Sequence, residues 1–155
     1  MSESESDIYR IALREAREGM REGGIPIGSA LARGAKLLAA GRNRRVQGSD
    51  PTAHAEIDCL RNAGRLRDYS DLTLYTTLAP CFLCSGAVVL FGIPRVVIGE
   101  RESYDASGPF SFLAQHGVQL ELLDDPGARG LMERFIHEQP RLWAEDIGHS
   151  AGRPD

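Results

Sequence analysis

Apolar residues near the start of the chain follow a helical period. From Ile8 to Ala16 they recur every three or four residues, so they would share one face of an amphipathic helix. Asp7 can cap the start of this helix, and Gly23 and Gly24 mark its end. Two apolar runs then flank a short turn that contains Gly34, which indicates two strands paired as an antiparallel hairpin.

Helices and strands alternate along the rest of the chain. Pro51 favours entry into a helix that Gly64 closes, and Pro80 opens another helix that Gly92 stops. The predicted order is α-β-β-α-β-α-β-(α)-β-α-α, where the parentheses mark a helix whose bounds the sequence pattern does not define. This order predicts an α/β fold in three α-β-α layers, with a central five-stranded mixed sheet. The expected strands are 25–32, 36–40, 72–78, 95–99 and 118–123, and the later helices are 53–62, 81–91, one from Asp125-Pro126 to Pro140, and 141–147.

The length and composition of the chain are those of an ordinary globular protein. Its 155 residues suffice for one domain with a real core, and we expect a single domain over residues 1–148. The last residues are rich in Gly, Ser and Pro, so we expect a flexible tail over 149–155. The formal net charge of −4 argues against a protein whose main task is to bind nucleic acid through its phosphates, so no nucleic acid partner is expected.

Targeting and redox features favour the cytoplasm. No apolar run approaches the length that spans a bilayer, so no membrane association is expected. The first residues are polar and acidic, unlike a secretory signal or a transit peptide. The three cysteines are an odd and sparse set, which indicates metal binding or catalysis in a reducing compartment rather than disulfides.

Two short segments carry residues that suit a metal site. One is His54-Ala55-Glu56, and the other is Pro80-Cys81-Phe82-Leu83-Cys84. Cys81 and Cys84 are three residues apart on a predicted helix, so their sulfurs share one face, and a helix N-terminus lowers the pKa of a thiol. Two thiolates and one imidazole suit a tetrahedral Zn²⁺ and leave a fourth position for water, whose pKa such a metal lowers to about 7. We therefore expect one Zn²⁺ per chain, held by His54, Cys81 and Cys84.

Glu56 is the candidate catalytic residue. It lies two residues beyond His54, so it would point beside the metal rather than at it. A carboxylate there can take a proton from water and pass it to a ring nitrogen and to a leaving amine. The combined pattern, H-x-E followed by P-C-x-x-C, is the known signature of zinc deaminases.

A closed structural zinc site is the alternative interpretation of the same residues. It would need a fourth ligand from the protein, as in a zinc module that binds a partner without catalysis. The other soft donors are His116, His137, His149 and Cys59, and none has a motif-like spacing to the set. We take Cys59 as a small core residue and the three histidines as surface residues.

The sequence resembles the fungal-type cytosine deaminases of the cytidine-deaminase superfamily over nearly its whole length. The segment from Asp50 to Glu56 is also similar to bacterial transfer-RNA adenosine deaminases and to guanine deaminases, whereas the one from Trp143 to Gly148 is the more specific sign of cytosine deaminase. The resemblance implies a cytidine deaminase-like fold, a homodimer, and the hydrolysis of free cytosine to uracil and ammonia. The similar stretches are Gly24–Gly28, Gly41–Asn43, His54–Ile57, Leu74–Cys81, Gly92–Arg95 and Trp143–Gly148.

The resemblance also implies a pocket for a free nucleobase, closed by the C-terminal helix. Asn43 would bind the carbonyl edge of the base, and Asp146 would hold ring N–H and amine groups. The remaining pocket residues implied in this way are Trp143, Ile147 and Tyr104 as walls, Ile27 beneath the ring, and the backbone carbonyl of Ala79 as acceptor of the leaving amine.

Each implied contact has a simpler competitor. Asn43 could shape a turn, and Trp143 could be plain core. Asp146 lies near a helix end, where the helix dipole disfavours a negative charge. This unfavourable position favours an active role for Asp146 over a merely solvated one. The three arginines around Asn43, at positions 42, 44 and 45, are expected to be a solvated loop, with a phosphate grip as the alternative.

Two departures from the resembling family leave the substrate open. Tyr104 stands where that family usually has Phe, and His149 replaces an acidic residue. A polar group added to a pocket can change which base is accepted, because buried donors must be satisfied. Guanine, 5-methylcytosine, creatinine, a triazine, or adenosine in transfer RNA therefore stay as alternatives to cytosine.

Overall fold

The first helix starts earlier than the sequence pattern predicts. The computed structural model describes residues 1–148, and the expected tail over 149–155 lies outside them. Helix α1 spans Glu3–Arg21 and is capped by Ser2, not by Asp7. Ser2 and Glu5 form a reciprocal capping box, which satisfies backbone N–H groups at the helix start, whereas Asp7 pairs with Arg10 on the exposed side.

The predicted hairpin is present, with its bounds moved toward the C-terminus. Strand β1 spans Gly28–Arg33 and β2 spans Lys36–Arg42. The segment before β1 does not join the sheet, because Pro26 has no N–H to donate to a ladder. Its end is held instead by a 2.9 Å hydrogen bond from the amide of Asn43 to the carbonyl of Ile27.

The other predicted elements occur in the predicted order. The helix whose bounds were open is α4, Ser107–Gln115. Helices α2 and α3 begin one or two residues later than expected, because His54 and Cys81 occupy their N-cap positions. The remaining elements are α2 Ala55–Ala63, β3 Leu72–Leu78, α3 Phe82–Phe91, β4 Arg95–Glu100, β5 Gln119–Leu122, α5 Pro126–Glu138 and α6 Pro140–Asp146.

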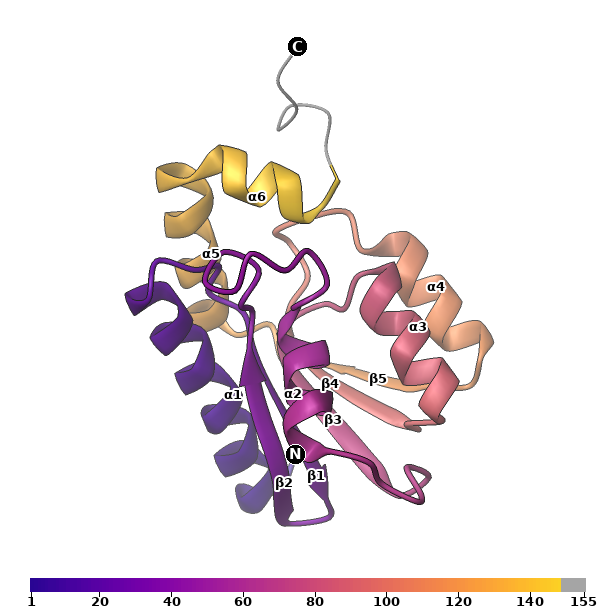
Figure 1. Cartoon of the computed structure of the whole chain (residues 1–155). Coiled ribbons are helices and arrows are strands. Elements are labelled where there is room, and N and C mark those ends of the chain that lie inside the picture. The colour runs from indigo at the N-terminus through magenta and orange to yellow at the C-terminus, as the bar shows by residue number, and fades with distance from the viewer. Residues whose placement is uncertain (149–155) are drawn as a thin grey trace.

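The five strands form one mixed sheet in the order β2-β1-β3-β4-β5. β1 is antiparallel to both β2 and β3, whereas β3, β4 and β5 run parallel. Helices α1 and α5 cover one face, and α2, α3 and α4 cover the other (Figure 1). The three-layer α-β-α sandwich predicted from the sequence is thus confirmed.

The two faces of the central strands fill two separate cores. In β3, Leu74 packs under α2, α3 and α4, while the next residue, Tyr75, packs under α1. This alternation places Thr76 on the face that carries α2, where it contacts Glu56, whereas Leu78 at the end of the strand joins a third cluster with Ala55 and Trp143. No helix in residues 1–148 combines the length and the hydrophobicity needed to cross a membrane.

Helix α2 approaches strand β2 closely. A Cβ at Gly41 would lie 2.3 Å from the backbone nitrogen of Cys59, so only glycine permits this contact. Cys59 is fully buried there, as expected for a core residue. The close approach fixes α2 against the sheet, and with it the position of His54 at its start.

Candidate functional site

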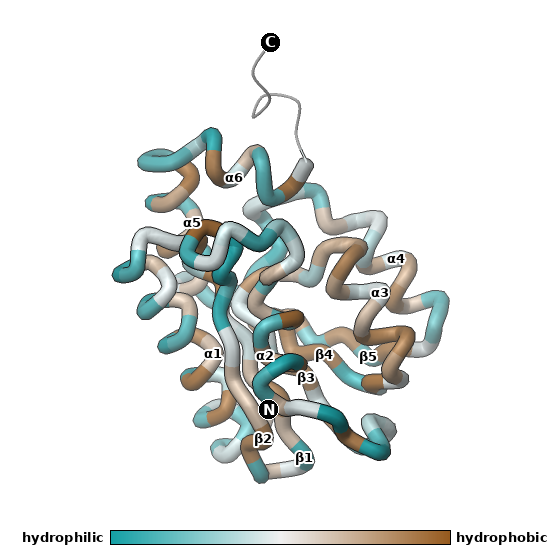
Figure 2. Tube along the Cα trace, in the orientation of Figure 1, coloured by the Kyte–Doolittle hydropathy of each residue, from teal (hydrophilic) through white to brown (hydrophobic). Residues whose placement is uncertain are grey.

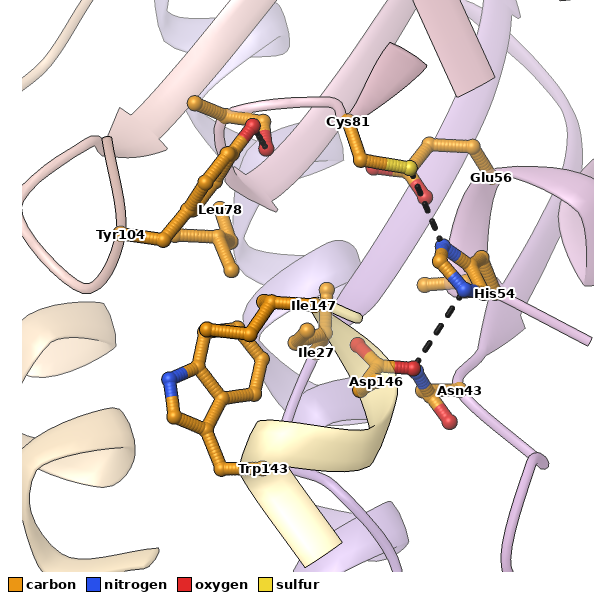
Figure 3. Close-up of a pocket in the computed structure, with 12 residues that line it drawn as sticks. Ile27, Asn43, His54, Glu56, Leu78, Cys81, Tyr104, Trp143, Asp146 and Ile147 are labelled. Carbon is orange, nitrogen blue, oxygen red and sulfur yellow. Dashed lines mark hydrogen bonds and ion pairs between the residues drawn. The ribbon is translucent and has the colours of Figure 1, made fainter. Parts of the chain in front are cut away.

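Two helix starts provide the candidate metal ligands. His54 is the N-cap residue of α2 and Cys81 the N-cap residue of α3, and neither side chain caps its helix. Ser, Thr, Asp or Asn would normally occupy such positions, because their oxygens accept the free backbone N–H groups. The two side chains instead point toward each other, with 3.4 Å between Sγ of Cys81 and Nδ1 of His54 (Figure 3).

Cys84 completes a group of three donors. The donor atoms of His54, Cys81 and Cys84 all lie within 4.8 Å of one another. Two sulfurs and an imidazole nitrogen are a donor set that suits Zn²⁺. The other soft donors stay apart from this group among residues 1–148: Cys59 is buried in the core, and His116 and His137 are exposed. His149 lies outside the described residues.

The three donors differ in charge state: the contact with Cys81 and burial raise the pKa of the Cys84 thiol, and the contact with Cys81 outweighs burial and raises the pKa of His54 to about 9, whereas Cys81 itself carries the negative charge. The neighbouring Cys84 and His54 side chains outweigh burial and lower the pKa of Cys81 to about 4. Cys81 is therefore a thiolate at neutral pH, which is the form that binds a metal. Nδ1 of His54 faces this sulfur, while its Nε2 lies 3.3 Å from Oδ1 of Asp146, an arrangement typical of a metal-bound histidine oriented by a carboxylate.

Glu56 lies directly beside the three donors. It is 4% exposed, and its Oε2 accepts a 3.0 Å hydrogen bond from the Cys84 thiol. Its Oε1 lies 2.9 Å from the hydroxyl of Thr76, which fixes the second oxygen. Burial raises the pKa of the Glu56 carboxyl. A carboxyl held in this way can exchange a proton with a group bound next to the metal donors.

A pocket adjoins the three donors and contains almost all the residues singled out from the sequence. Helix α6 covers it with Trp143, Asp146 and Ile147, opposite the start of α2 (Figures 1 and 3). Cys84 alone of the predicted site residues does not line the cavity, and it is fully buried. The lining is Ile27, Asn43, His54, Ala55, Glu56, Leu78, Ala79, Cys81, Tyr104, Trp143, Asp146 and Ile147.

Two buried polar atoms at this pocket have no hydrogen-bond partner within residues 1–148. One is the donor Nδ2 of Asn43, a residue with no exposed surface, and the other is the acceptor Oδ1 of Asp146, whose side chain is 5% exposed. Oδ1 lies within ion-pair distance of His54 without forming a hydrogen bond of good geometry. The Asn43 amide lies close enough to Asp146 to favour its charged form, but the two form no hydrogen bond of good geometry. Buried polar groups are normally paired, so this adjacent donor and acceptor suit a polar ligand.

The arginines around Asn43 are engaged by protein carboxylates. Arg42 contacts Glu15 at 2.7 Å and also pairs with Glu22, and Nε of Arg44 lies 3.1 Å from Asp58. Arg45 lies 3.9 Å from Asp146, at the edge of the pocket. These pairings argue against a phosphate grip, and they also differ from the expected solvated loop, because the side chains of Arg42 and Arg45 are only 18% and 22% exposed.

The sequence pattern missed three residues of the site. Leu78 and Ala55 line the pocket, and Thr76 contacts Glu56. The sequence does carry a signal for Thr76 and Leu78, because residues two apart in a strand point to the same side and both lie just before Ala79. Ala55 has no such signal, since its contribution depends on lying between His54 and Glu56.

Known proteins match this chain in both sequence and fold. The family model described as "Cytidine and deoxycytidylate deaminase zinc-binding region" matches residues 2–100. A protein of Candida albicans named cytosine deaminase is 42% identical over 142 residues, covering 90% of this chain and 93% of the relative. A tRNA-specific adenosine deaminase of Buchnera aphidicola is 39% identical over 123 residues, covering 76% and 80%.

A solved structure supports the same assignment. The guanine deaminase from Nitrosomonas europaea superposes with a TM-score of 0.72 at 25% identity, covering 83% of this chain and 82% of that one. Sequence, fold and the His54, Cys81 and Cys84 donor group agree. This chain therefore belongs to the cytidine and deoxycytidylate deaminase family and carries its zinc-binding region.

Proposed function

We propose that this chain hydrolyses free cytosine to uracil and ammonia. The observation that carries the proposal is the unpaired donor of Asn43 beside the unpaired acceptor of Asp146 in a covered pocket. Free cytosine has a matching edge, because its C2 carbonyl can accept from Asn43 while its N1–H donates to Asp146. Binding would thus satisfy both buried atoms in one step.

The same contact favours the free base over its nucleoside. N1 of cytidine carries the sugar and has no hydrogen to donate, so Asp146 would stay buried without a partner. Leaving such a group unpaired costs about 1–3 kcal/mol, and more when it is charged. The sugar would also have to fit beneath Trp143 of α6 and Ile147 at its C-terminal end, which cover the base pocket.

Glu56 is the residue positioned to move protons in this reaction. His54, Cys81 and Cys84 would hold Zn²⁺, which would supply Lewis-acid activation of the attacking water. Glu56 accepts a proton from that water and donates it to ring nitrogen N3, which makes C4 more electrophilic as the new C–O bond forms. The second proton of the water passes through Glu56 to the amine, the C4–N bond breaks, and ammonia leaves.

The surroundings of Glu56 support this role. The hydroxyl of Thr76 keeps one of its oxygens fixed. Trp143 and Ile147 shield the reacting groups from bulk water, which strengthens the electrostatic contacts inside. The carbonyl of Ala79 lies in the same pocket and is the proposed acceptor for the departing amine.

The proposal is tested by measuring ammonia release from free bases, nucleosides and nucleotides. We expect kcat/KM for cytosine to exceed that for cytidine roughly 100-fold or more, because a site built to bind an N–H rejects analogues that lack it. Guanine, 5-methylcytosine, creatinine and a triazine are included as alternative substrates. Faster turnover of cytidine than of cytosine would contradict the role of Asp146 and the substrate assignment.

A transfer-RNA adenosine deaminase is the second candidate, since relatives with that name match the chain. Such an enzyme needs an open pocket for a flipped base and a basic surface. Here α6 covers the pocket, and Arg42 and Arg44 are paired with carboxylates. Deamination of an adenosine in a transfer-RNA anticodon stem-loop, with no ammonia from cytosine, would favour this candidate.

We also propose that two copies of the chain associate through α2 and α3. Four large apolar side chains of α3 are exposed: Phe82 (62%), Leu83 (46%), Leu90 (78%) and Phe91 (42%). Figure 2 shows hydrophobic residues along this helix. Ile57 and Leu60 of α2 continue the same apolar surface. Phe82 instead packs against Phe112 of α4, so the shared surface consists of Leu83, Leu90 and Phe91 with the two α2 residues. Such an apolar face can pair with its own copy about a twofold axis, and the family resemblance favours that partner.

Replacing Leu90 by Lys is expected to convert the dimer into a monomer. The change places a charge within the proposed apolar interface, where it has no partner. Light scattering should give twice the chain mass of 16.9 kDa for the unmodified protein and that mass for the variant. Leu37→Lys is the control, because Leu37 is 39% exposed on the β1–β2 hairpin, away from α3. A monomeric unmodified protein, or an unchanged dimer in Leu90→Lys, would refute the interface.

A further inference from the structure

A fully buried carboxylate lies at the end of β4 and has no place in the mechanism above. Glu100 has no exposed surface. One of its oxygens, Oε2, accepts hydrogen bonds from the backbone amides of Glu102 at 2.6 Å and Ser103 at 3.1 Å, and the Ser103 hydroxyl donates to the other. The carboxylate therefore fixes the turn that leads from β4 to Tyr104.

Tyr104 extends from this turn to the segment that carries the metal ligand. Its hydroxyl lies 2.8 Å from the carbonyl oxygen of Ala79 and 2.8 Å from that of Pro80. Burial raises the pKa of Tyr104, so the hydroxyl keeps its proton and can donate it to either carbonyl. Phenylalanine, the usual residue of the resembling family here, could not make these contacts.

The same short segment is held at two further points. The amide of Ala79 donates a 2.8 Å hydrogen bond to the backbone carbonyl of Glu100. The hydroxyl of Ser85, one turn into α3, donates to the carbonyl of Pro80 at 3.3 Å. Residues 100–104 therefore contact both residues that precede Cys81, from the backbone and from a side chain.

We propose that Glu100 and Tyr104 are positioning residues that hold Cys81 in place to bind Zn²⁺. Neither side chain reaches the metal donors, and both act through the Ala79-Pro80 backbone. Cys81 is especially dependent on that backbone, because it is an N-cap residue in extended conformation, before the regular hydrogen bonds of α3 begin. A small shift of Pro80 would move the Cys81 sulfur relative to His54 and Cys84.

This inference concerns zinc binding by the chain and does not depend on which base is deaminated. Outer groups that orient a metal ligand contribute to affinity, and their loss typically weakens metal binding 10- to 100-fold. Tyr104 contacts carbonyls of the backbone next to a ligand rather than the ligand itself, so we expect an effect at the lower end of this range.

The test compares Tyr104→Phe with Tyr9→Phe. Both changes remove one hydroxyl from a largely buried tyrosine, but the hydroxyl of Tyr9 bonds to Asp125 under α1, on the other side of the sheet. We expect zinc affinity, measured by competition with a chromophoric chelator, to fall roughly tenfold in Tyr104→Phe and to be unchanged in Tyr9→Phe. Cobalt substitution gives a second readout, since the thiolate-to-cobalt absorption band should shift in Tyr104→Phe alone.

A second variant keeps the inference open to refutation. Glu100→Gln retains the size of the side chain but replaces one acceptor oxygen by a donor, so it should loosen the same turn and weaken zinc binding in the same direction. The zinc affinity of the double variant should be only slightly lower than that of the single variant with the lower affinity, because both residues act through one segment. Zinc affinity and cobalt spectra in Tyr104→Phe equal to those of the unmodified protein would overturn the proposal. If the unmodified protein itself bound no zinc, the proposed function would fail instead, which separates the two outcomes.

Discussion

Replacing Glu56 by Gln is expected to reduce ammonia release roughly 10³-fold while one zinc per chain stays bound. Glutamine has the same shape and can still accept the Thr76 hydroxyl at its remaining oxygen. It cannot take up a proton from water or deliver one to the base. Steady-state ammonia release and the zinc content of the purified variant are the two measurements.

The control for Glu56→Gln is Asp58→Asn, a buried carboxyl on the same helix changed to an amide. Asp58 faces away from the pocket and accepts hydrogen bonds from the Arg42 amide and the Arg44 guanidinium. We expect this variant to retain turnover within about threefold and to lose some stability, on the order of 1 kcal/mol. Two results would count against the role of Glu56: turnover within tenfold of normal in Glu56→Gln, or a loss of activity that simply follows a loss of zinc.

Replacing Cys84 by Ala is expected to remove zinc and, with it, measurable turnover. In structural zinc sites with four protein ligands, zinc binding contributes about 10–16 kcal/mol, or roughly 3 kcal/mol for each ligand. Loss of one of the three protein ligands here is therefore expected to lower the affinity about 100-fold or more. Cys84 is fully buried beside Glu56, so no solvent-exposed side chain can take the place of its sulfur. The measurement is metal content after gel filtration with a chelator, together with ammonia release before and after zinc is added back.

Cys59→Ala is a closely matched control for Cys84→Ala, because both cysteines are fully buried and free. The sulfur of Cys59 faces the carbonyl of Ala39 in the core under α2, outside the group of three donors. This variant should lose stability by about 1–2 kcal/mol for the small cavity but keep its zinc and its turnover. If both variants lost zinc equally, or if Cys84→Ala kept it, the assignment of Cys84 as a ligand would be wrong.

Local patterns were enough to predict the layers of the fold and the donor set. Cys81 and Cys84 are three residues apart, so a single helical turn places both sulfurs on one face. This pairing can be predicted without knowing the rest of the fold. The alternation of helices and strands likewise predicted the five-stranded sheet, because each element must bury its own apolar face. The start of α1 was predicted wrongly, since Ser2 and Glu5 form a reciprocal cap and Asp7 forms none.

Contacts between distant segments were decided only by the tertiary structure. His54 and Cys81 meet because α2 and α3 begin at the same end of the sheet, and their unused capping positions turn both side chains inward. The reach of Tyr104 to the Ala79 carbonyl, and of Asp146 to His54, depends on how a turn and the last helix pack over that end. Such pairings have no period along the chain, since they follow from packing between elements, whereas helix and strand patterns follow from the local geometry of the backbone.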